Sequence, residues 1–202
     1  MHRARLLAAA ILASATLAAG AAAAQTTLRI RGDIDSLQDH VLHVTSRAGE
    51  KLVVTLAPDT AVTVIAPSAL DAIKQGTYIG TAAMPQADGS VRALEVQVFP
   101  ESMRGVGEGS RPFDTQPGST MTNATVGSVT GTSGRRLTVN YQGKSTVVDV
   151  PANAPVITYE PGTMAMLTPG QHVLIFAATK AADGTITTNR VQVGKNGMVP
   201  PL

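Results

Sequence analysis

The sequence predicts an all-β protein built from two tandem modules. Apolar residues alternate with polar ones, as in Val96-Gln97-Val98, and this period of two is typical of half-buried strands. The pattern of residues 28–99 returns in residues 123–193, where the same triplet stands at Val191-Gln192-Val193. Such a repeat indicates that one small unit occurs twice. We therefore expect two OB-like β-barrels, with β-sandwich modules as the alternative, each with one short helix.

The first 24 residues have the features of a cleavable signal peptide. Arg3 and Arg5 precede an apolar run from Leu6 to Leu17, and Ala22-Ala23-Ala24 provides small residues for a cleavage site. The run is too short and too rich in alanine for a membrane span, which takes about 20 strongly apolar residues. We therefore expect export to the periplasm, with secretion as the alternative, and no transmembrane segment.

The first module is expected over residues 25–100. Leu52, Val54 and Leu56 alternate along one strand. The segment Pro67–Ile73 predicts a short helix, with Ser68 as its N-cap. Asp88-Gly89 then predicts a tight hairpin turn, because glycine accepts the positive φ that such turns require. Gln97 is expected to face solvent in the strand that follows.

The second module, residues 123–202, repeats these elements 94 or 95 positions later. Gly32 is matched with Gly127, and the short helix is expected again over Pro161–Leu167. Asp183-Gly184 predicts the equivalent hairpin turn. Repeats of this size lie near the lower limit for an independent hydrophobic core. We therefore expect the two modules to pack against each other, or to be braced by the segment that joins them.

These residues resemble a bacterial exported family known as domain of unknown function 5666, in its two-repeat alphaproteobacterial type. The family pattern ends in an Asp-Gly hairpin and an A-x-x-V strand, which Ala93-Leu94-Glu95-Val96 fits and Thr188-Asn189-Arg190-Val191 fits only at its valine. The joining stretches Gly107–Asp114 and Pro117–Ala124 also resemble this type. The resemblance implies an OB-like fold and export, and it implies no activity.

The connecting segment, residues 101–122, contains side chains that a passive linker would not need. The candidate ligand or interface residues in and beside it are Arg104, Arg111, Phe113, Asp114, Met121 and Asn123. We expect Arg111 and Asp114 to form an ion pair, with Phe113 pointing into the interface between the modules. This predicts an ordered Gly/Pro-rich strap. The alternative is the lip of a groove that binds a peptide or a small ligand.

Composition excludes a nucleic-acid partner. The chain has 16 Lys and Arg against 14 Asp and Glu, and these charges balance once Arg3 and Arg5 are removed. Its one adjacent basic pair is Arg135-Arg136, and it has no tryptophan. Binding of nucleic acid would need a basic stripe with stacking aromatic residues. Tyr78, Phe99 and Phe176 are instead expected in the core.

Metal and cofactor sites are not expected. His40 and His43 are three positions apart, and on a strand such residues point to opposite faces, so they would not converge on a metal unless residue 40 lies in a turn. Met164 and Met166 could bind copper, but core packing is the simpler explanation of two methionines in a predicted helix. The absence of cysteine excludes disulfides and a lipid-bearing cysteine.

No motif in the sequence indicates an enzyme. It contains neither G-x-S-x-G nor H-E-x-x-H, and Gly105–Gly109 lacks the lysine of a phosphate-binding loop. We therefore expect a non-enzymatic binding or interaction module of the cell envelope, with an unknown protein or small-molecule partner. The alternative is a periplasmic metal- or small-molecule-binding protein that uses the groove between the repeats.

Overall fold

The computed structural model describes residues 25–131 and 135–201, so the expected signal peptide lies outside the described residues. The described chain is all-β, with twelve strands and no helix longer than a single 3₁₀ turn. The strands are β1 (Thr26–Gln38), β2 (Val41–Ser46), β3 (Lys51–Pro67), β4 (Tyr78–Pro85), β5 (Val91–Val98), β6 (Gly109–Pro112), β7 (Thr120–Thr130), β8 (Arg136–Tyr141), β9 (Lys144–Asp149), β10 (Val156–Pro161), β11 (His172–Lys180) and β12 (Ile186–Gly194). The 3₁₀ turns are η1 (Leu70–Ala72), η2 (Glu101–Met103), η4 (Met164–Met166) and η5 (Lys195–Gly197).

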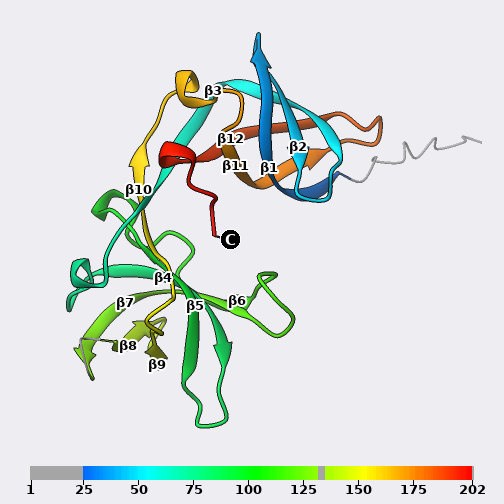
Figure 1. Ribbon diagram of the computed structural model, residues 1–202. Helices are drawn as coiled ribbons and strands as arrows, with labels where there is room; N and C mark the ends of the chain where they lie inside the picture. The colour runs from blue at the N-terminus through cyan, green and yellow to red at the C-terminus, as the bar shows by residue number, and fades with distance from the viewer. Residues whose placement is uncertain (1–24, 132–134, 202) are drawn as a thin grey trace, which may run out of the picture.

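Five strands form a closed barrel in the upper part of Figure 1. β2 pairs antiparallel with β1 and β3, and β11 pairs antiparallel with β1 and β12. The parallel pairing of β12 with β3 closes the ring, which has no free edge. We call this set of strands the first circuit.

A second circuit of pairings joins β4, β5, β7, β8 and β9 in the lower part of Figure 1. β7 pairs antiparallel with β4 and β8, while β4–β5 and β8–β9 are also antiparallel. A short parallel register connects β5 to β9, in which Val91 lies opposite Val148 and Arg92 opposite Asp149. β6 adds to the side of this circuit by pairing with β7.

The two circuits exchange strands between the repeats. The first circuit takes β1, β2 and β3 from the first repeat but β11 and β12 from the second. The second circuit takes β7, β8 and β9 from the second repeat but β4 and β5 from the first. Strand pairing therefore does not follow the expected tandem division into residues 25–100 and 123–202. The cause is that the chain leaves the first circuit after β3, forms the whole second circuit with β4 to β9, and returns to the first circuit only at β11.

The crossing strands β3 and β10 pair with each other in antiparallel register. Ile65 lies opposite Tyr159, and these two residues are equivalent in the repeat because they are 94 positions apart. On either side, Thr63 pairs with Pro161 and Pro67 with Ile157. The register is symmetric about the Ile65–Tyr159 pair, which therefore marks a pseudo-twofold axis between the circuits.

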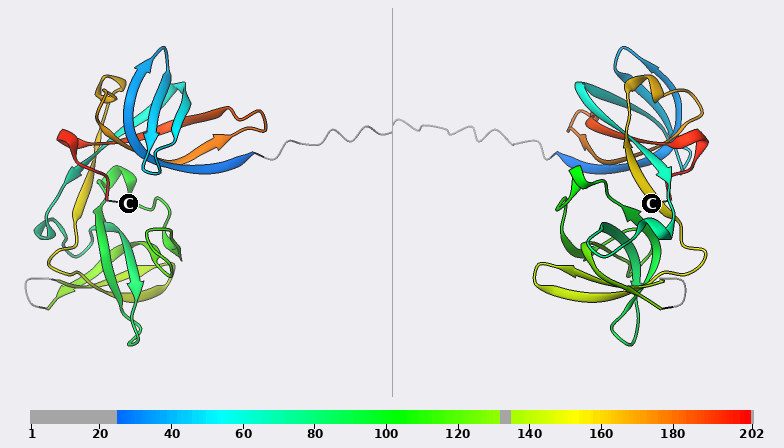
Figure 2. Two further views of the ribbon diagram at one scale, coloured as in Figure 1. Left: turned by 45° about the vertical axis from the view of Figure 1, so that its right-hand side comes forward. Right: turned by 90° about the vertical axis from the view of Figure 1, so that its left-hand side faces the viewer.

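Three groups of buried apolar side chains hold the structure together. One fills the barrel of the first circuit and includes Leu42, Val54 and Val191, and a second fills the other circuit around Ile79 and Leu137. The third is the junction core, which comprises Ile65, Tyr78, Ala82, Phe99, Met121, Ile157, Tyr159 and Leu174. Both views in Figure 2 show β3 and β10 running between the two parts, where this core lies.

Several local predictions are confirmed and others are wrong. Gly89 and Gly184 have φ values of 82° and 87° in the hairpin turns expected at the Asp-Gly pairs. The predicted short helices are single 3₁₀ turns, η1 and η4. Ser68 does not cap η1, because the preceding residue in the N-cap position is Ala69, which makes no side-chain hydrogen bond there.

The match of Gly32 with Gly127 is also wrong, by three positions. Gly32 pairs with Val173 on the neighbouring strand β11. The residue equivalent to Val173 in the first repeat is Ile79, and Ile79 pairs with Ala124 on β7. Ala124 therefore occupies the place of Gly32. The difference arises because the loop between β7 and β8 is three residues longer than the loop between β1 and β2.

Strand exchange predicts that a cut between the repeats does not separate them. A protease site inserted between Pro117 and Gly118, both exposed, would give two fragments that each supply strands to both circuits. We expect the cleaved protein to elute as one species from a size-exclusion column in native buffer and as two species in denaturant. Two folded fragments that separate in native buffer would contradict the exchange.

Candidate functional site

A groove of about 630 Å³ lies where the two circuits meet. We call it the junction groove. Its apolar lining comes from both circuits and from the connecting segment, and it consists mainly of Phe99, Met103, Phe113, Met121, Tyr159, Leu174 and Phe176. A concave, largely apolar surface of this size is typical of a small-molecule site. The junction groove is therefore the strongest candidate for a functional site in the described chain.

The aromatic floor of the groove depends on unequal residues at equivalent positions of the repeat. The ring of Phe99 lies 5.4 Å from that of Tyr78 and 5.4 Å from that of Tyr159. Gly80 leaves room for this ring, since a Cβ there would lie 3.0 Å from Phe99 Cε2. The equivalent of Phe99 is Gly194, where a Cβ would lie 1.7 Å from the Met198 carbonyl oxygen. The aromatic stack consequently forms on one side of the axis only.

A buried chain of hydrogen bonds lies behind this floor. The Tyr159 hydroxyl donates to Gln97 Oε1 at 2.7 Å, and Gln97 Nε2 donates to Glu95 Oε1 at 2.8 Å. The Glu95 side chain is only 1% exposed, and burial raises its pKa to about 7, partly offset by the hydrogen bond from Gln97. Burial also raises the pKa of Tyr159, with a smaller contribution from Glu95, so this phenol stays protonated as a donor.

Gln97 and Gln192 are equivalent in the repeat but have different environments. Gln97 accepts a hydrogen bond from Tyr159, whereas the residue equivalent to Tyr159 is Ile65, which has no donor. Among the described residues, Gln192 Oε1 and Asn123 Oδ1 are buried atoms without a hydrogen-bond partner. Both side chains line the junction groove. The polar lining of the groove therefore differs on the two sides of the pseudo-twofold axis, as its aromatic floor does.

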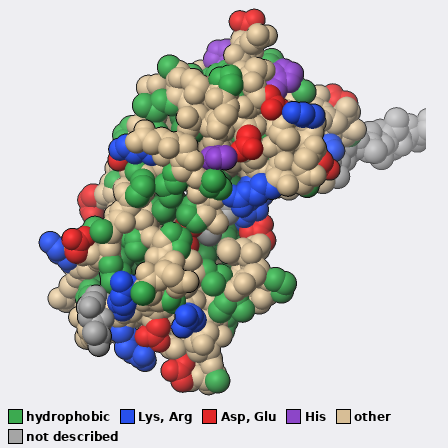
Figure 3. Space-filling view, in the orientation of Figure 1, with side chains coloured by type: hydrophobic (Ala, Val, Ile, Leu, Met, Phe, Trp, Pro, Cys, Tyr) green, Lys and Arg blue, Asp and Glu red, His purple; other side chains and the backbone are tan. Residues whose placement is uncertain are grey.

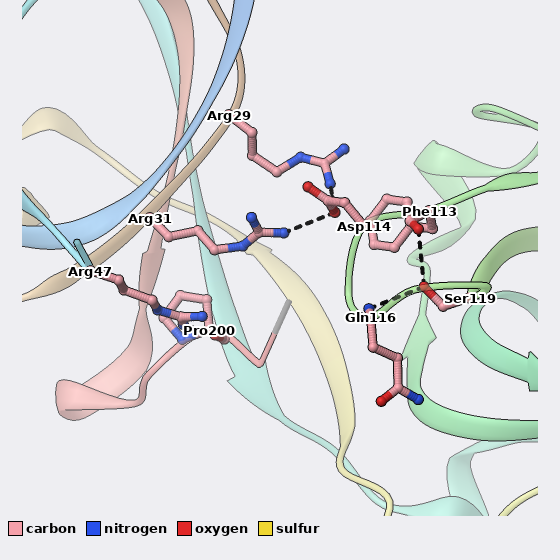
Figure 4. A network of polar contacts seen from close by, with 8 residues as sticks. All are labelled: Arg29, Arg31, Arg47, Phe113, Asp114, Gln116, Ser119 and Pro200. Carbon is pink, nitrogen blue, oxygen red and sulfur yellow. Dashed lines mark hydrogen bonds and ion pairs between the residues drawn. The ribbon is translucent and has the colours of Figure 1, made fainter.

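The connecting segment reaches back to the first circuit through Asp114. This carboxylate forms an ion pair with Arg29 and another with Arg31, whose Nη2 lies 3.2 Å from Asp114 Oδ1 (Figure 4). The loop that carries Asp114 is closed by Ser119, whose hydroxyl donates to the Phe113 carbonyl at 3.1 Å. Partial burial acts to raise the pKa of Asp114, but Arg31 and Arg29 outweigh it and lower that pKa below its ordinary value.

Arg29 also contacts two aromatic rings of the groove. Its guanidinium carbon lies 4.6 Å from the centre of the Phe113 ring and 4.9 Å from that of Phe176. Phe113 belongs to the connecting segment and Phe176 to β11, so one side chain of β1 joins two parts of the wall. Such cation–π contacts stabilise the arrangement in addition to the ion pair.

The predicted site residues divide into three places. Arg111, Phe113, Met121 and Asn123 line the junction groove, and Asp114 lies beside it. Met121 is buried in the junction core, and the amide of Asn123 donates to the Val106 carbonyl at 3.0 Å. Arg104 does not line the groove. Its guanidinium pairs with Glu101 and donates to the Gly76 carbonyl at 2.9 Å.

The predicted ion pair between Arg111 and Asp114 is wrong. Arg111 Nη1 instead donates to the Gly107 carbonyl at 2.9 Å, and Asp114 faces Arg29 and Arg31. The reason is that Arg111 lies in the extended strand β6. Along an extended chain, residues three positions apart point in opposite directions, whereas on a helix they would be neighbours.

Sequence reasoning missed the contributions of Arg29, Arg31, Gln97, Phe176 and Gln192. Gln97 was expected to face solvent, but it is only 3% exposed, because the second face of β5 is covered at the junction. Tyr78 and Phe99 are buried as expected, whereas Phe176 is partly buried and lines the groove. One signal was present in the sequence, since the Val-Gln-Val triplet occurs in both repeats at the strands that approach the axis.

No group of three His, Cys, Asp or Glu side chains within residues 25–131 and 135–201 is placed to hold a metal ion. His40 lies in the turn between β1 and β2, and His43 lies on β2. Met164 packs against the first core, while Met166 is exposed. None of the described helices is both long enough and apolar enough to cross a membrane.

Comparison of the chain with models of protein families, with curated proteins and with solved structures gave no match.

The burial of Glu95 predicts a pH-dependent stability. Because its folded pKa of about 7 exceeds its ordinary value of 4.5, the folded state holds this proton more tightly than the unfolded state. The free energy of unfolding should therefore fall as the pH rises from 4.5 through 7, by up to about 3 kcal/mol. Glu95→Gln should lose this dependence.

Urea denaturation at pH 5 and pH 8 gives the free energy of unfolding of the original protein and of the Glu95→Gln variant. The effect is the amount by which the change between the two pH values is larger in the original protein. Glu50→Gln, at an exposed position, is the matched control and should keep the original pH profile. Equal pH profiles for Glu95→Gln and the original protein would show that folding does not raise the pKa of Glu95.

Proposed function

We propose that the protein is a non-enzymatic binding protein whose junction groove takes a small apolar ligand that carries an acidic group. The observation that supports this most directly is the combination of an aromatic floor with unpaired cationic side chains at the rim. The groove offers Phe99 from its floor and Phe113 and Phe176 from its wall to an apolar body. A volume of about 630 Å³ suits one ligand of moderate size.

The charge of the groove selects an acid over a base. Arg29, Arg111 and Arg190 line it, and no Asp or Glu in the described part of the chain does so. Arg29 is paired with Asp114, but the exposed guanidinium groups of Arg111 and Arg190 form no ion pair within the described residues. A guanidinium binds a carboxylate or sulfonate through two parallel hydrogen bonds, which orients the ligand.

A fluorescent dye with this chemistry tests the proposal. The probe is 1-anilinonaphthalene-8-sulfonate, which combines aromatic rings with one sulfonate, and dodecanoate serves as its competitor. We expect the dye to bind the original protein, dodecanoate to displace it, and Arg111→Ala combined with Arg190→Ala to weaken the dye about tenfold.

The matched control is Lys144→Ala, which removes an exposed cation from β9, away from the groove. It should leave the affinity for the dye unchanged, and thermal melting of each variant shows whether it remains folded. Equal affinities for the original protein and the doubly substituted variant would refute the junction groove as the site.

We also propose that each circuit is an OB-like barrel, so that the chain is a pair of such barrels with exchanged strands. The pairing order supports this. In the first circuit β3 lies parallel to β12, and in the second circuit β9, which is equivalent to the start of β3, lies parallel to β5, which is equivalent to β12. The 3₁₀ turns support it too, because Leu167 after η4 packs into the first core and Ile73 after η1 into the second. An OB-fold is a five-stranded barrel of this kind.

The proposed biological setting is the cell envelope. It is supported by the signal-peptide features of residues 1–24 and by the resemblance to the exported family of domain 5666. In this proposal, cleavage after Ala24 releases the protein into the periplasm with Gln25 at its N-terminus.

N-terminal sequencing of protein from fractionated cells tests the export proposal. We expect Gln25 as the first residue of protein in the periplasmic fraction. A substitution of Ala22 and Ala24 by bulky residues should block cleavage, because signal peptidase requires small side chains there. Recovery of the chain from the cytoplasm with Met1 intact would refute export.

A further inference from the structure

A second groove, of about 710 Å³, lies on the other side of Asp114. We call it the basic groove. Its cationic lining consists of Arg29, Arg31, Arg47, Lys51 and Lys180. Against these five, the acidic residues that line it are Glu50 and Asp114. Lys and Arg side chains are visible in Figure 3 where the upper and lower parts of the molecule meet.

The strands bring three arginines of this groove together. Arg29 and Arg31 are two positions apart on β1 with buried Ile30 between them, so both point away from the barrel core. Arg47 follows β2, and its backbone N–H donates to the Arg31 carbonyl at 2.8 Å. Figure 4 shows the three side chains extending toward the loop of Asp114 and the C-terminal segment.

Two of these three guanidinium groups share a single carboxylate. Asp114 pairs with Arg29 and Arg31, while Arg47 Nη2 donates to the Pro200 carbonyl at 2.8 Å. Each guanidinium has five N–H donors, so most of the donors of the cluster are not used by these contacts. Burial lowers the pKa of Arg29, and the nearby charges of Arg31 and Arg111 lower it further, against the opposing effect of Asp114.

Asp114 is placed so that an anion from solvent can replace it. Its side chain is 53% exposed, and it lies in a loop whose other hydrogen bonds are internal. In that loop the Phe113 N–H donates to the Ser119 carbonyl at 2.9 Å, and the Gln116 N–H donates to the Ser119 hydroxyl at 3.3 Å. The Asp114 side chain can therefore leave the arginines while the hydrogen bonds inside the loop are kept.

We propose that Arg29, Arg31 and Arg47 form a binding site for a phosphate-type oxyanion, and that Asp114 is the internal group that this anion displaces. A phosphate group has more acceptor oxygens than a carboxylate, so it can take the place of Asp114 on Arg29 and Arg31 and offer a further oxygen to Arg47, which lines the same groove. Lys180 extends the cationic surface for a ligand with a second phosphate, whereas Lys51 is already paired with Asp35 at 3.2 Å. Arg29 lines both grooves, whereas Arg31 and Arg47 line only the basic groove, so this site does not depend on the ligand proposed for the junction groove.

Calorimetric titration with inorganic pyrophosphate at low ionic strength tests the site. Asp114→Asn removes the competing charge and keeps the shape of the side chain, so it should raise the affinity about tenfold. Arg31→Ala should abolish binding, while Lys144→Ala on β9 should leave it unchanged. A structural ion pair without a binding role predicts no gain for Asp114→Asn.

The source of the phosphate is distinguished by a second measurement. Sedimentation with phosphatidylglycerol vesicles, compared with phosphatidylcholine vesicles, shows whether the site takes a lipid headgroup as well as a soluble anion. Binding of pyrophosphate alone would assign a soluble ligand, and binding of the phosphatidylglycerol vesicles as well would show that the site also takes a lipid headgroup. The proposal is overturned by unchanged or weaker pyrophosphate binding in Asp114→Asn, or by an equal loss in Arg31→Ala and Lys144→Ala. Melting curves identify any variant that does not fold, and Asp114→Asn remains decisive if Arg31→Ala is one of them.

Discussion

The antiparallel pairing of β3 with β10 is the constraint on which the rest of the structure depends. β3 carries the chain out of the first circuit and β10 carries it back from the second, so their pairing fixes where β4 and β11 begin. It also sets the distance between the circuits, because Ile65 and Tyr159 meet directly on the axis. The junction core and both grooves form around this crossing.

The repeat makes the two circuits similar in structure. Where they meet, different residues at equivalent positions make the two sides of the pseudo-twofold axis unlike each other. Tyr159 pairs with Ile65, the residue to which it is equivalent in the repeat. The ring of Phe99 has no counterpart in the second repeat, because the equivalent residue is Gly194 and the Met198 backbone lies against it. Equal residues at these positions would give two similar half-grooves. The unequal residues give instead one aromatic groove, with its cations at the rim and Glu95 buried behind it.

The strands and the Asp-Gly turns could be predicted from the sequence, because alternation and turn chemistry are local properties. The exchange of strands between the repeats could not be predicted from the sequence. Val191 lies opposite Val62 and Val96 opposite Val156, and pairing within each repeat would bring together the same types of residue. Phe113 and Asp114 could be identified as unusual in a glycine-rich segment. Their contact with Arg29 could not be predicted, because Arg29 is far from them in the sequence and is brought close to them only by the exchange of strands.

Strand exchange also determines the order in which the chain can complete its fold. The first circuit closes only when Ile186 reaches Val54, so the barrel that begins with the first strand needs the last one. Contacts this distant in sequence close slowly, because the intervening chain must lose its freedom first. A ribosome that has synthesised only the first repeat therefore holds β1 and β3 with unpaired edges, and the earliest strands made are among the last to find their partners.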